Sequence, residues 1–158
     1  MTATNLPLGR KTDSPQKYAP EVLSPVARSE SRDPLGIGEP LPFSGVDTWT
    51  AWELTWLADS GRPEVATARI VVPADSPNLI ESKSLKLYLG SFAMTRFRTA
   101  ERMCRTIEED LSDCAGAPVA VALDPAVAIG ALPGTCIDAL DVECAEWEVD
   151  AGLLEADT

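Results

Sequence analysis

The residues best suited to chemistry in this sequence lie in one short segment, residues 78–88, directly after the turn-forming run 73–77. The segment holds one carboxylate, Glu81. Two hydroxyls and two lysines accompany it: Ser82, Ser84, Lys83 and Lys86. A carboxylate accepts hydrogen bonds from the polar edge of a ligand, and ammonium groups bind anions. This combination indicates a ligand-binding segment.

The same segment also has a purely structural interpretation as a helix. Successive helical residues turn by about 100°. One face would then be apolar, with Leu85, Tyr88, Leu89 and Phe92. The opposite face would carry Lys83, Lys86 and Gly90. Asn78 suits the N-cap, and Glu81, three residues later, suits a capping box. Spacing alone favours a capping role for Glu81 and a solvated face for the lysines over a binding site.

Length and charge narrow the class of protein. A chain of 158 residues with 45% hydrophobic and 24% charged residues is typical of one globular domain. The formal net charge of −12 argues against a nucleic-acid partner, because phosphate binding depends on lysine and arginine. The acidic residues crowd the last stretch, whereas most basic residues precede residue 106. A small anionic ligand is therefore expected to bind in the earlier region.

Neither metal chemistry nor a membrane is indicated. The chain has four cysteines without CxxC spacing and no histidine, so neither a zinc site nor a Cys-His nucleophile is expected. We assign no catalytic residue and no metal ligand. No apolar run approaches the roughly 20 residues that span a bilayer, and the N-terminus lacks a signal pattern. The expected compartment is the cytoplasm, where each cysteine would be a small buried hydrophobe.

Composition divides the chain into three parts. Residues 1–42 hold seven of the thirteen prolines and are expected to run as extended chain over the surface, pinned by Tyr18, Leu23 and Val26. Residues 43–150 are expected to form the folded module. Residues 151–158 are expected to form a flexible tail.

Within the module, periodicity predicts two strands, two helices and two strands. Alternation over 46–57 predicts a strand with Trp52, Leu54 and Trp56 on its core face, and a second strand follows at 64–72. After the helix described above, apolar spacing predicts a helix over 99–114, with Gly116 as a left-handed C-cap. The remaining strands are expected at 119–123 and 136–147.

This order predicts an α+β fold in which an antiparallel sheet carries both helices on one face. The other face would offer Trp49, Val65 and Val71. Such a face needs cover, so we expect the sheet to meet a second sheet, either in another subunit or in another half of the same protein.

Several motifs, taken together, resemble a known family. The run 79–89, Leu-Ile-Glu-Ser-Lys-Ser-Leu-Lys-Leu-Tyr-Leu, with Ser91-Phe92 and Thr95-Arg96-Phe97 after it, is similar to the signature of the queuosine-pathway nitrile reductases, the QueF family. Further matching motifs occur in the family's order: Leu41-Pro42-Phe43 with Gly45, Asp47 and Trp49, then Glu53-Leu54 and Trp56-Leu57, then Gly134-Thr135-Cys136-Ile137-Asp138. The resemblance covers roughly residues 8–148 and is to the N-terminal half of the two-module form.

The resemblance implies a fold and an activity. The family has the tunnelling fold (T-fold), in which antiparallel sheets with helices on one side assemble into barrels, in agreement with the order ββααββ. It reduces 7-cyano-7-deazaguanine to 7-aminomethyl-7-deazaguanine with two NADPH per turnover. A cysteine attacks the nitrile to give a thioimide, hydride reduces it, and an aspartate supplies protons.

By resemblance, Ile80, Glu81 and Ser82 contact the deazaguanine, and Ser82 and Lys83 contact NADPH. Lys86 would be a supporting charge. Gly90 departs from the pattern, since an asparagine is common there. The family's catalytic cysteine and aspartate, with a substrate-binding His-Glu pair, belong to the C-terminal half, and neither Cys114 nor Cys136 matches that motif.

Three functions remain open from the sequence. The first is the N-terminal module of the nitrile reductase, paired with a second T-fold module or assembled as a homo-oligomer. The second is a non-catalytic purine-binding or assembly module of the same fold. The third is a pterin or purine cyclohydrolase, which is disfavoured because its zinc chemistry needs His and Cys ligands that are not evident here.

Overall fold

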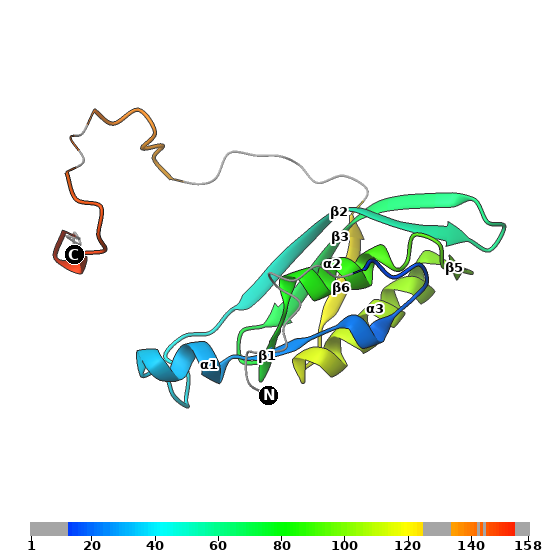
Figure 1. Ribbon diagram of the computed structural model, residues 1–158, viewed down its shortest axis with the longest axis horizontal. Helices are drawn as coiled ribbons and strands as arrows, with labels where there is room; N and C mark the ends of the chain where they lie inside the picture. Colours follow the sequence, from blue (N-terminus) through cyan, green and yellow to red (C-terminus); the bar gives the residue numbers. More distant parts are fainter. Residues whose placement is uncertain (1–12, 125–133, 142, 144, 154–158) are drawn as a thin grey trace. The chain divides into compact units, whose positions relative to one another are not determined.

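The computed structural model describes residues 13–124, 134–141, 143 and 145–153. These fall into two units, Met1–Val127 and Ala128–Thr158. Among the described residues, every strand and α-helix belongs to the first unit, which is drawn in Figure 1 with its elements labelled. All residues of the candidate site therefore belong to the first unit.

Four strands of the first unit form a mixed sheet in the order β5-β2-β3-β6. β2 (Val46–Ala58) and β3 (Pro63–Pro73) make an antiparallel hairpin, and β6 (Ala120–Asp124) pairs antiparallel with the other edge of β3. The predicted strands at 46–57, 64–72 and 119–123 are confirmed. β5 (Arg96–Phe97) was not predicted and runs parallel to the end of β2, so the sheet is not wholly antiparallel.

A bulge in β2 changes which side chains face the core. The pairing with β3 shifts between Ala51 and Leu54, which adds one residue to β2. Before the shift Trp49 packs against the core, and after it Leu54 and Trp56 do so. Trp52 is 58% exposed, so its predicted place on the core face is wrong, as is the predicted place of Trp49 on the outer face. One extra residue reverses the alternation, which a strict period of two cannot anticipate.

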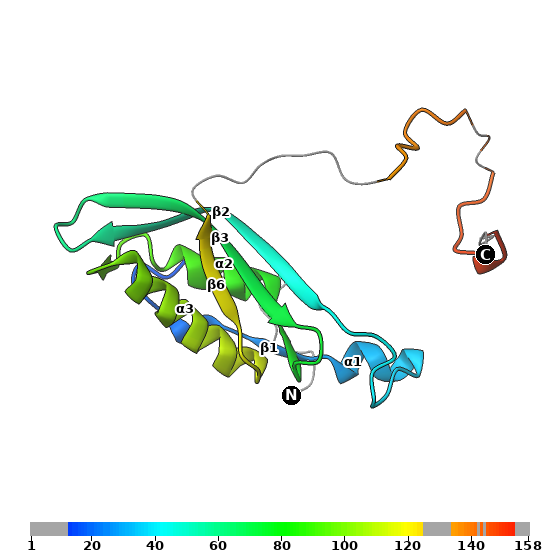
Figure 2. The same ribbon diagram turned by 180° about the vertical axis from the view of Figure 1, so that it is seen from behind.

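The two long helices lie on one side of this sheet, as Figures 1 and 2 show from opposite directions. α3 (Ala100–Ala115) begins after its N-cap Thr99, whose hydroxyl accepts the Arg102 N–H at 3.2 Å. It ends at Gly116, which has a φ of +72° in the left-handed region. The predicted helix over 99–114 is confirmed to within one residue at each end.

α2 (Ser82–Gly90) begins three residues later than the capping-box interpretation requires. Residues Asn78–Ile80 form a short strand, β4, that pairs antiparallel with β1 (Pro25–Ala27). Asn78 is therefore not an N-cap, and Glu81 itself caps α2. The spacing of apolar residues located the helix correctly, but a polar residue three positions upstream fits a strand end equally well.

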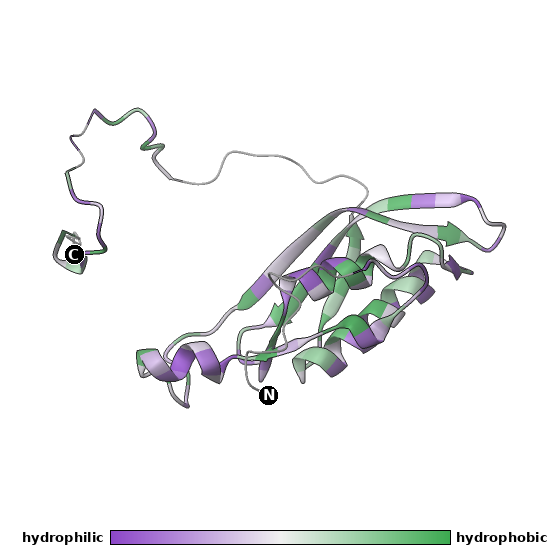
Figure 3. Ribbon diagram, in the orientation of Figure 1, coloured by the Kyte–Doolittle hydropathy of each residue, from purple (hydrophilic) through white to green (hydrophobic). Residues whose placement is uncertain are grey.

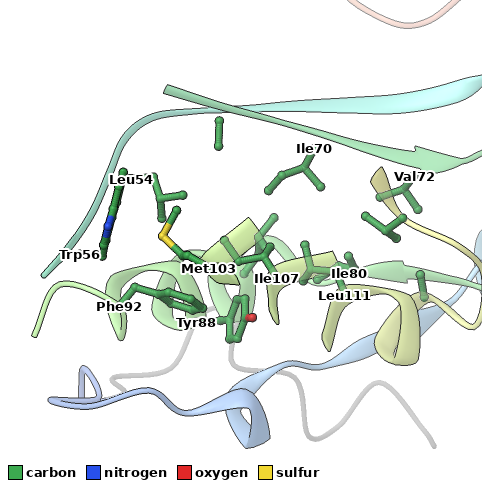
Figure 4. Close-up of a cluster of buried hydrophobic side chains, with 14 residues drawn as sticks. Leu54, Trp56, Ile70, Val72, Ile80, Tyr88, Phe92, Met103, Ile107 and Leu111 are labelled. Carbon is green, nitrogen blue, oxygen red and sulfur yellow. The ribbon is translucent and has the colours of Figure 1, made fainter. Parts of the chain in front are cut away.

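The core lies between the sheet and the helices. Figure 4 shows Leu54, Ile70 and Val72 from the sheet facing residues of the helical layer. Those residues are Tyr88, Phe92, Met103, Ile107 and Leu111, all with no exposed surface. Hydrophobic and hydrophilic residues are interspersed along α2 and α3 in Figure 3, as expected for helices with one buried face. Each such buried side chain stabilises the fold by about 1.5–3 kcal/mol.

The described part of the N-terminal segment, residues 13–42, is more ordered than its proline content predicts. It contains short 3-10 turns, Pro20–Val22 and Asp33–Leu35, the strand β1 and one helical turn, α1 (Ser29–Arg32). Tyr18, Leu23 and Val26 do pin the segment down. The Tyr18 hydroxyl donates to Asp110, Leu23 packs against the core, and Val26 pairs with Leu79.

The second unit contains no strand within its described residues, 134–141, 143 and 145–153. The strand predicted at 136–147 is thus not found: the chain turns after Ile137, whose carbonyl accepts the Leu140 N–H at 3.1 Å. Alternating residues are only half of what a strand needs, since its backbone must also pair with a neighbour. Of the predicted tail, Ala151–Leu153 form a 3-10 turn, and 154–158 lie outside the described residues.

Candidate ligand-binding site

Glu81 stands at the junction of β4 and α2, where an extended backbone turns into a helix. Its side chain caps the helix: one carboxylate oxygen accepts the Lys83 N–H at 2.9 Å and the other accepts the Ser84 N–H at 2.7 Å. Only 6% of the residue is exposed. A carboxylate here satisfies two orphan donors and complements the positive end of the helix dipole.

The backbone of Glu81 is held as firmly as its side chain. Its N–H donates to the Ser24 carbonyl at 2.9 Å, and its own carbonyl accepts the Leu85 N–H and the Ser84 hydroxyl at 2.9 and 2.7 Å. A carboxylate has about four acceptor positions. Because the cap uses two of them, Glu81 retains the capacity to accept hydrogen bonds from a ligand.

A cavity of about 350 Å³ lies between α2 and the part of β2 around its bulge, and Ser82, the residue after Glu81, belongs to its lining. Its apolar lining comes from both layers: Trp49, Leu54, Ile70, Leu85 and Leu89. The polar residues that line the cavity are Ser82 and Lys86 of α2 and Thr50, Glu53 and Thr55 of β2. An apolar cleft with a few polar groups is the usual form of a small-molecule site.

The residues of α2 that line the cavity differ from the contact residues predicted from the sequence. Of the four predicted contact residues, only Ser82 lines the cavity. Ile80 is 4% exposed and packs in the core, and Glu81 and Lys83 lie next to Ser82 in the chain but do not line the cavity. The binding roles of Ile80, Glu81 and Lys83 therefore stay predictions, because these residues do not line the cavity.

Two further residues of α2, Lys86 and Gly90, line the cavity. From the sequence, Lys86 was expected only to be a supporting charge, and Gly90 was noted only as a departure from the family's pattern. Ser82, Lys86 and Gly90 are spaced by four residues, so they follow one another along a single helix face. That spacing was visible in the sequence. The other wall of the cavity was not, because it depends on the bulge that turns Trp49 towards α2.

The thiols of the first unit are not activated nucleophiles. Burial raises the pKa of Cys114 to about 11, and burial, aided by the nearby Glu108 and Glu101 carboxylates, raises the pKa of Cys104. A catalytic cysteine needs the opposite shift, because the thiolate is the nucleophile. The described cysteines of this unit therefore fit a structural role.

The described residues hold neither a metal-binding cluster nor a membrane-spanning helix. No cluster of three or more Cys, Asp or Glu side chains there is arranged to hold a metal ion. In the same part of the chain, no helix combines the length and the apolar composition needed to cross a membrane.

Comparison with known proteins gives a consistent result. Residues 14–123 match a family model described as nitrile reductase, 7-cyano-7-deazaguanine-reductase N-term. An NADPH-dependent 7-cyano-7-deazaguanine reductase of Chromohalobacter salexigens is 50% identical over 159 residues, covering 98% of this chain and 57% of that protein. Proteins of the same name from Paraburkholderia xenovorans and Teredinibacter turnerae are 44% and 48% identical over 161 and 151 residues, covering 99% and 94% of this chain. The chain spans only 54–59% of the length of these relatives.

Proposed function

Because the chain belongs to the N-terminal family of the 7-cyano-7-deazaguanine nitrile reductases, we propose that it is the module of an NADPH-dependent reductase that binds the substrate and the cofactor. The observation that carries the proposal is that the family match, residues 14–123, coincides with the unit that holds Glu81 and the cavity beside Ser82. The reaction converts 7-cyano-7-deazaguanine to its 7-aminomethyl product in queuosine biosynthesis, a tRNA-modification pathway of the cytoplasm.

Glu81 has the chemistry to hold the deazaguanine. A guanine-like edge presents adjacent N–H donors, and a carboxylate with spare acceptor positions recognises them as a pair. Ile80 and Ser82, on either side of Glu81, complete the proposed substrate contacts. Since the cap already fixes the carboxylate in place, the ligand would meet a preorganised acceptor.

The residues of α2 suit a phosphate-bearing cofactor. NADPH, when bound, supplies the hydride that reduces the nitrile carbon. Ser82 and Lys83 are the proposed contacts, and Lys86 presents a second ammonium at the cavity one turn further on. The apolar wall beneath them keeps water from the bound ligand.

The proposal assigns the covalent chemistry to the rest of the reductase. A thiol that attacks the nitrile must be partly ionised, and burial raises the pKa of Cys104 and Cys114. The relatives are nearly twice as long as this chain, which leaves room for a second module that carries the nucleophile and the proton donor.

The proposal also includes the T-fold and its assembly. The hairpin β2–β3, the two helices on one face and β6 support the first five elements of the order ββααββ. The sixth element rests only on the alternating residues at 136–147, which would form a strand where a neighbouring strand pairs with them. Exposed Val65, next to core-facing Ala66, supports a partner on the sheet face that the helices leave uncovered.

Titration calorimetry tests the binding role. The chain is expected to bind 7-cyano-7-deazaguanine and NADPH, and to show no steady NADPH oxidation when both are present. Steady turnover by the chain alone would refute the assignment of the chemistry elsewhere. Addition of the C-terminal part of the Chromohalobacter salexigens relative is expected to start reduction. Binding without reduction in that mixture would favour the alternative, a non-catalytic purine-binding or assembly module.

A further inference from the structure

An N-terminal strap, defined here as residues 18–28, runs along α2 on the side away from the sheet. In Figure 4 the blue ribbon of this segment lies beyond the helices, with the core and the sheet on their other side. The strap is one of the three layers of the unit, although it contains only the short strand β1 and a 3-10 turn. Because the strap lies along α2, its hydrogen bonds can fix residues of that helix.

Three buried or half-buried hydroxyls hold the strap to α2 and the turn that follows it. Ser84, Ser91 and Thr95 accept backbone N–H groups of the strap from Ser24, Ala19 and Tyr18 at 3.1, 3.2 and 3.1 Å. Each hydroxyl also donates to a carbonyl one turn back, at 2.6–2.9 Å. Each is thus used in both directions, which fixes its orientation.

Both ends of the strap are anchored as well. The Tyr18 and Tyr88 hydroxyls donate to the same oxygen of Asp110, at 2.6 and 2.5 Å, which links the strap to both helices. At the other end Arg28 is 7% exposed, pairs with Asp47 and donates to Ser76 at 3.1 Å. A strap held at both ends transmits its position to whatever it contacts between them.

Between the anchors, the strap meets the residue that caps α2. The Ser24 carbonyl accepts the Glu81 N–H, and the Ser24 N–H donates to the Ser84 hydroxyl, which donates in turn to the Glu81 carbonyl. The Ser84 N–H meanwhile donates to the Glu81 carboxylate. Ser24, Glu81 and Ser84 therefore form a closed set of hydrogen bonds that fixes the backbone and side chain of Glu81 together.

We infer that the strap is a positioning element for Glu81 and that Ser84 is the positioning residue through which it acts, an inference that rests on the proposed substrate role of Glu81. α2 has nine residues, and isolated helices shorter than about 12–15 residues are marginal in water. Its first turn needs support from outside the helix. A binding carboxylate needs placement within about 0.5 Å, which a fraying helix end does not give.

The chain offers a matched pair of variants for the test. Ser84 and Ser91 are both buried, at 0% and 1% exposed, and each accepts one strap N–H and donates to the carbonyl three residues earlier. Ser84→Ala and Ser91→Ala remove the same hydrogen bonds, one beside Glu81 and one at the far end of α2. We expect similar falls in melting temperature, with about a ten-fold weaker Kd for 7-cyano-7-deazaguanine in Ser84→Ala only. Equal changes in Kd for both variants, or none, would overturn the inference.

Amide hydrogen exchange gives a second readout that needs no ligand. In Ser84→Ala the amides of Glu81, Lys83 and Ser84 are expected to exchange faster than in the unaltered chain, whereas Ser91→Ala leaves them unchanged. If the unaltered chain binds no deazaguanine, the proposed function fails and the exchange result alone decides about the strap. Unchanged exchange at these three amides in Ser84→Ala would overturn the positioning role whether or not the ligand binds.

Discussion

Glu81 caps α2 and is also the proposed substrate contact, and the two roles can be separated by substitution. Its two oxygens already accept the N–H groups of Lys83 and Ser84, so a ligand would use the acceptor positions that remain. A glutamine keeps one oxygen but turns an NH2 group towards donors, where it accepts nothing. The substitution therefore removes part of the cap and the charge that a guanine-like edge would recognise.

We expect Glu81→Gln to weaken binding of 7-cyano-7-deazaguanine more than binding of NADPH, and to lower the free energy of unfolding by about 0.5–2 kcal/mol. Titration calorimetry with each ligand measures the first effect, and urea unfolding measures the second. Thr99→Ala is the matched control, because it removes the N-cap of α3 without touching the cavity. Equal loss of both ligands, or of neither, would return Glu81 to a capping role alone.

The two tyrosines that donate hydrogen bonds to Asp110 make the stability of the fold depend on pH. Burial first, and then the hydrogen bond to Asp110, raise the pKa of both Tyr18 and Tyr88 above the ordinary value of about 10. Above pH 10 the folded chain therefore holds more protons than the unfolded chain. Stability is unaffected by these groups below pH 10 and falls as the pH rises above it.

Urea unfolding between pH 8 and pH 11 should show this fall, and Tyr88→Phe should make it less steep. Phe keeps the ring that packs against Phe92 at 5.1 Å, so the variant should stay folded. The slope of the unaltered chain in the same buffers is the reference. An unchanged slope in Tyr88→Phe would show that other groups account for the alkaline loss.

Residue types in the sequence singled out a segment that borders the cavity, but not the geometry of that segment. Glu81, Ser82 and the two lysines were singled out because few other segments combine such groups. The capping residue was misplaced at Asn78, because a polar side chain before a helix has the same pattern as the end of a strand. Whether a carboxylate caps a helix or faces a cavity depends on the backbone, which residue type alone does not determine.

At the scale of elements, α3 does more than cover the sheet. Its side chains also reach β6 and the residue before it: the Glu108 carboxylate accepts the Val121 N–H of β6 at 3.0 Å, and the Ser112 hydroxyl accepts the N–H of Val119, just before the strand, at 2.9 Å. Within the described residues, no strand pairs with the outer edge of β6. Unpaired edge groups are templates for aggregation, so these two side chains protect the edge until a strand pairs there.

We expect Glu108→Ala to expose the Val121 N–H and to raise the rate of self-association at constant protein concentration, with a stability loss of about 1 kcal/mol. Light scattering and urea unfolding measure the two effects. Glu109→Ala is the control, since it removes the same charge from a neighbouring exposed position. Equal association of the two variants would assign the effect to net charge.

The elements differ in how far the sequence could predict them. α3 was predicted to within one residue at each end, because its apolar spacing and its C-cap glycine agree. The extent of β2 was predicted correctly, but the side of the sheet on which its side chains lie was predicted only in part. A simple alternation of apolar and polar residues does not reveal the bulge. The stretch 136–147 has the pattern of a strand but no partner among the described residues. Local patterns thus predict local elements, and they fail where a distant strand must complete the pairing.

At the scale of the whole molecule, the uncovered sheet face is the feature that the first unit leaves unexplained. Val65 is 65% exposed and faces away from the helices, because its neighbour Ala66 packs against the core, and Trp52 in the bulge of β2 is 58% exposed. Exposed apolar residues that gather on one face mark an interaction site. The relatives are longer than this chain by an amount that could form a second module, and a second sheet is the element that fits such a face.

A charge on this face should therefore block assembly without unfolding the unit. We expect Val65→Glu to abolish association with the C-terminal part of the Chromohalobacter salexigens relative, as measured by sedimentation velocity, because an interfacial carboxylate without a partner is costly to bury. The melting temperature should change little, since the side chain is already solvated. Met94→Glu is the control, because Met94 is 67% exposed in the turn between α2 and β5, away from the sheet face. Association of the Val65→Glu variant at the unaltered affinity would place the interface elsewhere, and the free edge of β2 would be the next surface to test, because β5 pairs only with Leu57 and Ala58.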